Sequence, residues 1–114
     1  MATIPAFSVV LWELAAGWTG PGPELSPPVP SGMVWVARSV SATWPSHAAG
    51  TSTTRLLFFV DGRPTWTTPP CTSRRGIPYE AEDVRWVLPA GAFFSVESDN
   101  GNWTVRVSGY QLSA

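Results

Sequence analysis

Prolines and glycines limit what this chain of 114 residues can fold into, because twelve prolines and ten glycines divide it into short segments. Proline removes a backbone donor and fixes φ, while glycine marks tight turns, so long helices are disfavoured throughout. The segments between them carry no helical period and are rich in β-branched and aromatic residues. This pattern predicts an all-β sandwich or barrel with about seven or eight strands and no helix longer than about two turns.

Turn signals separate the strands that we predict. The strands cover residues 7–15, 33–44, 54–62, 63–68, 84–88, 93–98 and 103–112. Asp61-Gly62 predicts a tight hairpin between the third and fourth of these, and Asn100-Gly101 precedes the last. The chain is long enough for one compact domain and too short for two.

The last predicted strand changes its pattern at Gly109. Trp103, Val105 and Val107 share one face, whereas the large residues beyond the glycine, Tyr110 and Leu112, have the opposite parity. Side chains in a strand alternate between faces with a period of two. The change of phase therefore predicts a β-bulge at this point or a strand that passes from one sheet to the other.

A short motif occurs twice: "VPSG" at 29–32 and "LPAG" at 88–91, each followed by a predicted strand. A proline fits just before a strand because it cannot donate to the ladder, and the glycine supplies the turn geometry. We therefore expect the two motifs to begin strands at corresponding positions in the two sheets of a sandwich.

The segment 17–32 contains five prolines, which exclude it from the centre of a sheet. We predict an extended, polyproline-like arm, anchored by Trp18 and Leu25, that lies across a neighbouring subunit or across its own sheet. Residues 1–28 would then form an N-terminal strand and arm, and residues 29–114 the sandwich core. On this interpretation the core folds without residues 1–28 but assembles poorly.

Composition excludes several classes of function. The net charge of −1 argues against nucleic acid as a partner, since binding phosphate needs a basic surface. All seven basic residues are arginine, which with abundant alanine, glycine and proline suggests a GC-rich genome. The start of the chain lacks the features of a signal peptide, and no apolar run reaches the roughly 20 residues needed to span a bilayer. We expect no membrane partner.

Residues that carry chemistry are few. His47 is the single histidine and Cys71 the single cysteine, so no intrachain disulfide can form and a zinc or iron site lacks ligands. Glu80, Glu82 and Asp83 lack the glycine-punctuated spacing of a calcium loop and are expected to be solvated or to pair with arginines. A catalytic triad forms in space and is not excluded by spacing alone. We nevertheless predict no catalytic, metal-binding or cofactor-binding residue and a protein that is not an enzyme; a small hydrolase is the remaining alternative.

Seven tryptophans are an unusual number for this length. Trp35 alternates with Val34 and Val36, so it faces outwards if those valines face inwards. The same parity argument places Trp86 outwards. Exposed tryptophan usually marks an interface. The predicted interface residues are Trp18, Leu25, Trp35 and Trp86.

Two stretches carry a resemblance. The sequence "VPSGMVWVARSVSATW" at 29–44, together with "LPAGAFFSVES" and "WTVRVSGYQLS" within 87–113, resembles small virion proteins of tailed bacteriophages that infect high-GC hosts. Those proteins are usually minor tail proteins or head decoration proteins. The resemblance implies a jelly-roll-like β-sandwich that oligomerises on the particle.

These observations together predict a structural virion subunit without enzymatic activity. We expect it to self-associate, with a symmetric homotrimer as the first choice, and to pack on other virion proteins. A place in the tail is favoured over the alternative, a capsid decoration protein. A second alternative is a glycan-binding module for the host surface. Glycan binding needs two or three coplanar exposed rings, whereas assembly needs rings buried between subunits.

Overall fold

The computed structural model describes residues 9–15, 23–43, 55–68, 78–98 and 103–113, with the side chains of residues 78–83 left out of the description. The strands are β1 (Val9–Leu14), β2 (Glu24–Leu25), β3 (Met33–Thr43), β4 (Leu57–Val60), β5 (Arg63–Thr67), β6 (Pro78–Leu88), β7 (Phe94–Glu97) and β8 (Thr104–Ser113). The described residues form no helix, and therefore none that could cross a membrane. The prediction of an all-β sandwich is confirmed.

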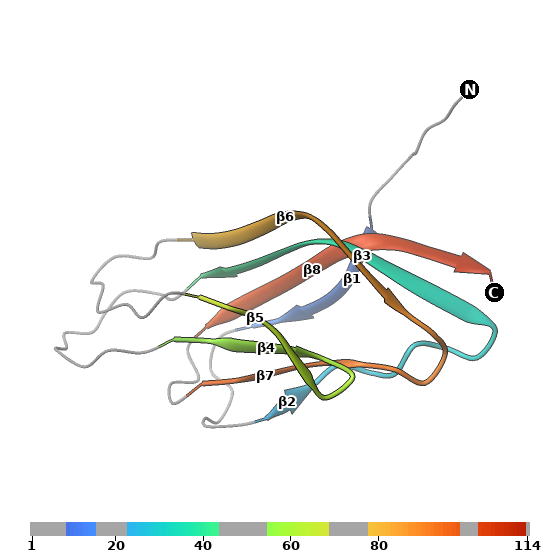
Figure 1. Ribbon diagram of the computed structural model, residues 1–114, viewed down its shortest axis with the longest axis horizontal. Coiled ribbons are helices and arrows are strands. Elements are labelled where there is room, and N and C mark those ends of the chain that lie inside the picture. Colours follow the sequence, from blue (N-terminus) through green and yellow to red (C-terminus); the bar gives the residue numbers. More distant parts are fainter. Residues whose placement is uncertain (1–8, 16–22, 44–54, 69–77, 99–102, 114) are drawn as a thin grey trace, which may run out of the picture.

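Two four-stranded antiparallel sheets pack against each other (Figure 1). Sheet A has the order β1-β8-β3-β6, and sheet B has the order β2-β7-β4-β5. Each connection except that between β4 and β5 passes from one sheet to the other. The pairs are nested, β4 with β5, then β3 with β6, β2 with β7 and β1 with β8, as in one long hairpin wrapped around a core.

The repeated motif forms the same turn twice. Gly32 and Gly91 have φ of 80° and 90°, a conformation that glycine adopts without steric cost. In each turn the residue after the glycine donates its N–H to the proline carbonyl, over 3.1 Å in 29–32 and 3.0 Å in 88–91. One turn leads into β3 of sheet A and the other into β7 of sheet B. The expectation that the two motifs begin strands in the two sheets of the sandwich is confirmed.

The β4–β5 hairpin closes through Asp61 and Gly62, both with positive φ, 52° and 82°. Two such residues in succession make the type I′ turn that suits the right-handed twist of a hairpin. The predicted Asp-Gly turn is therefore confirmed, whereas Asn100-Gly101 lies outside the described residues.

The described part of the proline-rich segment, residues 23–32, lies along its own sheet. β2 pairs with β7 at the edge of sheet B. Ser26 continues the contact, since its N–H donates to the Phe94 carbonyl over 2.8 Å and its Oγ accepts from the Phe94 N–H over 2.9 Å. β1 likewise pairs with β8. Both strands before residue 29 are thus parts of the sheets, so we no longer expect residues 29–114 to fold alone.

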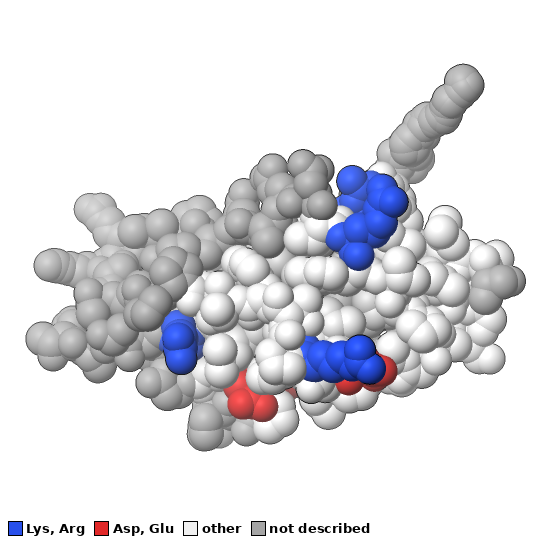
Figure 2. Space-filling view, viewed as in Figure 1, with Lys and Arg blue, Asp and Glu red and all other residues white. Residues whose placement is uncertain are grey.

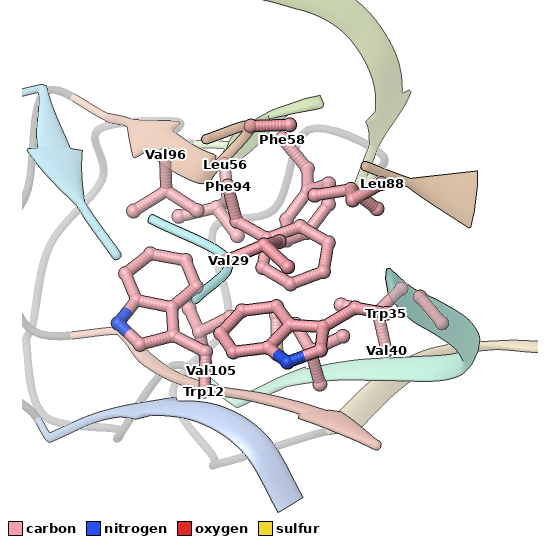
Figure 3. Close-up of a cluster of buried hydrophobic side chains, with 14 of the residues drawn as sticks. Trp12, Val29, Trp35, Val40, Leu56, Phe58, Leu88, Phe94, Val96 and Val105 are labelled. Carbon is pink, nitrogen blue, oxygen red and sulfur yellow. The ribbon is translucent and has the colours of Figure 1, made fainter. Parts of the chain in front are cut away.

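The core is rich in aromatic rings drawn from both sheets. The rings of Trp12 and Trp35, from sheet A, stack on Phe94 of sheet B, with centroids 6.2 and 5.9 Å from it (Figure 3). The ring centroid of Phe58 lies 5.6 Å from that of Phe94, and the two rings are tilted by 45°. Trp103 is fully buried. Most of the tryptophans that the structure describes therefore build the protein's own core.

β3 contains a bulge that reverses its alternation. Arg38 is an extra residue relative to β8, and β6 is irregular at the same level. Before the bulge Trp35 faces the core and Val34 and Val36 face away from it, whereas after the bulge Val40 faces the core. The expectation that Val34 and Val36 face inwards is wrong, because the inserted residue shifts the parity of the strand by one between Val36 and Val40.

The change of phase at Gly109 has a related origin. β8 stays in sheet A along its whole length, and the bulges lie in its two neighbours, at Leu11 of β1 and Arg38 of β3. The prediction of a bulge at this level is correct, but its extra residues belong to the partner strands. β8 itself keeps its parity, so Tyr110 and Leu112 lie on its outer side, away from sheet B.

Candidate functional site: two apolar outer faces

The described residues offer no cluster for chemistry. They contain no group of three or more His, Cys, Asp or Glu side chains that could hold a metal ion. Every buried side-chain nitrogen or oxygen in this part of the chain has a hydrogen-bond partner. His47 and Cys71 lie outside the described residues, as do the side chains of the acidic stretch 80–83. The absence of catalytic activity therefore stays a prediction. The remaining candidates for a functional site are surfaces of the described residues.

Two of the predicted interface tryptophans face the core. Trp35 is only 7% exposed, and its Nε1 donates to Oε1 of Gln111 over 2.9 Å. Trp86 is half-buried and stacks on Phe58 at 5.4 Å, while Arg85 and Val87 on either side of it point outwards. The outward placement of both tryptophans is therefore wrong, for Trp35 because of the bulge at position 38. For Trp86 the prediction exchanged the two faces of β6, because Trp86 faces the core and its neighbours Arg85 and Val87 face outwards.

The other two candidates fare differently. Leu25 is 58% exposed and remains available for contact. Trp18 lies outside the described residues. None of the described tryptophans, at positions 12, 35, 66, 86 and 103, is exposed, so these five do not form the platform of exposed rings that glycan stacking needs.

An apolar patch lies on the outer side of sheet A; we call it face A. It consists of five side chains from three adjacent strands: Val34, Val36, Val87, Tyr110 and Leu112. Leu112 pairs with Val34, and Tyr110, Val36 and Val87 form the next row across the sheet. Val87 is 58% exposed and Leu112 51%. An outer face of an antiparallel sheet is ordinarily polar, so this patch needs an explanation.

Polar residues occupy the same side of sheet A beyond the bulges at Leu11 and Arg38, where the sheet bends (Figure 1). They are Glu13, Ser39, Ser41, Thr43, Thr104, Arg106 and Ser108. Arg106 and Glu13 form an ion pair there, 2.7 Å between Nη2 and Oε2. This half of the outer side is therefore mostly polar, and Val10 of β1, which pairs with Ser108 and is 51% exposed, is an apolar exception.

A second apolar patch, face B, lies on the outer side of sheet B. The register places Leu25, Ser95, Phe59 and Pro64 in one row across all four strands, with Leu57 in the next row. Ser95 is buried, and Leu25 and Phe59 are its neighbours in the row on either side. Face B therefore presents aliphatic, aromatic and proline side chains from β2, β4 and β5.

The described charged residues beside face A are two arginines, whereas those beside face B are of both signs. Arg38 and Arg85 stand at the bend beside face A, and the Nε of Arg38 donates to the Val84 carbonyl over 3.1 Å. The charged residues beside face B are Glu24, Arg55, Asp61, Arg63 and Glu97. Three carboxylates thus accompany two guanidinium groups there. Figure 2 shows basic side chains over the sheet A side, and both basic and acidic side chains along sheet B.

The sequence contained one signal for face A. Large apolar residues move to the opposite parity at Gly109, which places Tyr110 and Leu112 on the outer side once the strand keeps its register. The sequence contained no such signal for face B, because its residues come from separate strands that only the folded sheet brings side by side.

Comparisons with protein-family models, with curated proteins and with solved structures gave no match.

Proposed function

We propose that this chain is a structural subunit of a tailed-phage particle, without enzymatic activity, that assembles through its outer faces. A place in the tail is favoured over one in the head. The support from the sequence is the resemblance of 29–44 and 87–113 to small virion proteins. The support from the fold is a β-sandwich whose strand order, β1-β8-β3-β6 over β2-β7-β4-β5, we interpret as a jelly roll, an architecture common in viral particles.

Face A is the observation that carries the proposal. Five apolar side chains in adjacent positions cost solubility and add nothing to the core. A contiguous apolar patch on the outer side of a sheet is typical of a surface that binds another molecule, and this supports contact with a neighbouring protein. A subunit that packs on its neighbours needs an apolar surface of this kind.

Capsid decoration uses the same surfaces and differs only in location. The direct test is to purify particles of the phage that encodes this chain, identify the chain in them by mass spectrometry and locate it by electron microscopy. We expect stoichiometric copies along the tail. Density on the capsid would move the assignment to decoration, and absence from the mature particle would refute the structural role.

A matched pair of variants links the location to face A. Val87→Asp introduces a charge into the patch at an exposed position, and Ser41→Asp introduces the same charge into the polar half of the same sheet. In a phage that lacks the gene, Ser41→Asp should be incorporated like the wild type and Val87→Asp should not. Equal incorporation of both variants would contradict the role given to face A.

A further inference from the structure

We infer that two copies of this chain join edge to edge, by antiparallel pairing of residues 110–113 at the end of β8 across a two-fold axis. The inference deepens the proposed self-assembly by naming a contact, and it rests on that proposal only for its biological purpose. The contact itself can be tested in solution without any particle.

The end of β8 has a strand partner on one side only among the residues that the structure describes. Residues 110–113 pair with residues 33–36 of β3, whereas the pairing of β8 with β1 ends where Gly109 lies opposite Val9. Figure 1 shows β8 running on past the end of β1. On that side the backbone N–H and C=O groups of residues 110–113 form an open edge, to which a further strand can add.

This edge lacks the features that block the outermost strands of the two sheets. In sheet B, β5 contains Pro64 and β2 leads directly into two prolines. In sheet A, β1 bulges at Leu11, and β6 begins with a proline and is irregular along its length. Prolines and bulges prevent another strand from pairing. Residues 110–113 contain no proline and no charged side chain, and their ladder with β3 is regular.

A second copy fits this edge because an antiparallel pair of identical strands is self-complementary. A two-fold axis normal to the sheet keeps the outer sides of both copies on one side, and side chains directly opposite each other share a face. In a register centred on Leu112, the Leu112 side chains of the two copies meet on the outer side, and Gln111 of each copy lies opposite Ser113 of the other. Leu112 is 51% exposed, so this pairing covers apolar surface that the single chain leaves in water.

The pairing also joins the two faces A. Tyr110 and Leu112 belong both to the open edge and to face A, which continues across β3 and β6. Two copies would therefore present one apolar surface that extends over three strands of each copy. An isologous contact about a two-fold axis gives a dimer, so the inferred unit is a dimer and not the trimer expected from the sequence.

Leu112→Lys and Val87→Lys separate a contact through the edge from a contact through the face. Both positions lie on face A and are similarly exposed, 51% and 58%, but Val87 is on β6, two strands away from β8. Lysine at an edge is a common barrier to strand pairing. Analytical ultracentrifugation of the full-length chain measures association, and circular dichroism verifies that each variant folds.

The edge is only four residues long, so we expect a weak dimer of the wild type that forms at high protein concentration. Val87→Lys should form the same dimer, and Leu112→Lys should associate about tenfold more weakly or worse. Hydrogen exchange of the wild type needs no variant. Among the backbone amides of residues 110–113, those that point away from β3 should exchange more slowly as the protein concentration rises.

Four results would overturn the inference. The first is a wild type that stays monomeric at high concentration. The second is a Leu112→Lys variant that associates like the wild type. The third is equal weakening by both variants, which would assign the contact to face A. The fourth is exchange at residues 110–113 that does not depend on concentration, which would mean that no second copy covers the edge. Presence of the chain in particles is a separate result, so the proposed function can survive each of these.

Discussion

Replacing Gly109 with alanine tests the close approach of β8 to β3, on which the bend of sheet A depends. An added Cβ would overlap the carbonyl oxygen of Val36 and would lie 2.9 Å from Cα of Ala37. Both atoms belong to the backbone of the neighbouring strand, so no side-chain rotation can make room. The two strands would have to separate locally, which strains the ladder between them.

Two physical effects of this substitution oppose each other. Gly109 does not have the positive φ that favours glycine, so alanine would restrict the unfolded chain and stabilise the fold by about 0.4–1 kcal/mol if space were available. Overpacking costs about 1–3 kcal/mol, and each weakened ladder hydrogen bond about 1 kcal/mol more. We expect a net loss of about 3 kcal/mol, a large part of the 5–15 kcal/mol typical of a domain.

Urea unfolding, followed by tryptophan fluorescence, measures this loss. Gly91→Ala is the matched control, because an added Cβ there meets no atom within 4 Å and pays only for a φ of 90°. That conformational cost is about 1–2 kcal/mol. A Gly109→Ala variant as stable as the wild type, or more stable, would refute the close approach of the two strands.

Three further predictions test other parts of the fold by the same unfolding assay. Thr68→Val should cost about 1–3 kcal/mol, because it strands the buried N–H of Leu56, which donates to the Thr68 hydroxyl over 3.0 Å, whereas Thr68→Ser should retain most of the stability. Arg106→Gln should change stability by no more than about 0.5 kcal/mol, since its ion pair with Glu13 is exposed; a large loss would show that the pair is more than a surface contact. Deletion of residues 1–28 should abolish cooperative unfolding, because it removes β1 and β2, and a cooperative transition would show that those strands are dispensable.

Local chemistry predicted the turns well and the strand limits less well. The hairpin at Asp61-Gly62 and both proline-glycine launches follow from backbone preferences that neighbouring residues decide. The sequence did not predict β2, because this strand is only two residues long and forms through its pairing with β7 in the folded sheet. β6 begins at Pro78, six residues before its predicted start. The acidic residues within that extension have poor strand propensity, and pairing with β3 overrides it.

The sequence could not predict which side chains of β3 face the core, because one inserted residue, Arg38, reverses the alternation along the strand. Val34, Val36 and Val40 all occupy even positions, and nothing in the local sequence marks Arg38 as the residue that interrupts the ladder. The bulge exists because β8 presents Gly109 at that level and β3 must pass close to it. A contact between residues about 70 positions apart therefore sets which side of β3 is buried.

The same bulge links the core to the surface proposed for assembly. With the extra residue in place, Trp35 reaches Phe94 and Val34 and Val36 must face outwards; without it, the valines would turn in and Trp35 would leave the core. The core therefore requires that positions 34 and 36 be outside, but it does not require that they be valine. Beyond the bend, the outward positions of the same strand are serine and threonine, so this sheet tolerates polar residues there. Apolar side chains at 34 and 36, beside Val87, Tyr110 and Leu112, are thus not required by the packing of the core, and this supports the proposed contact of face A with a neighbouring molecule.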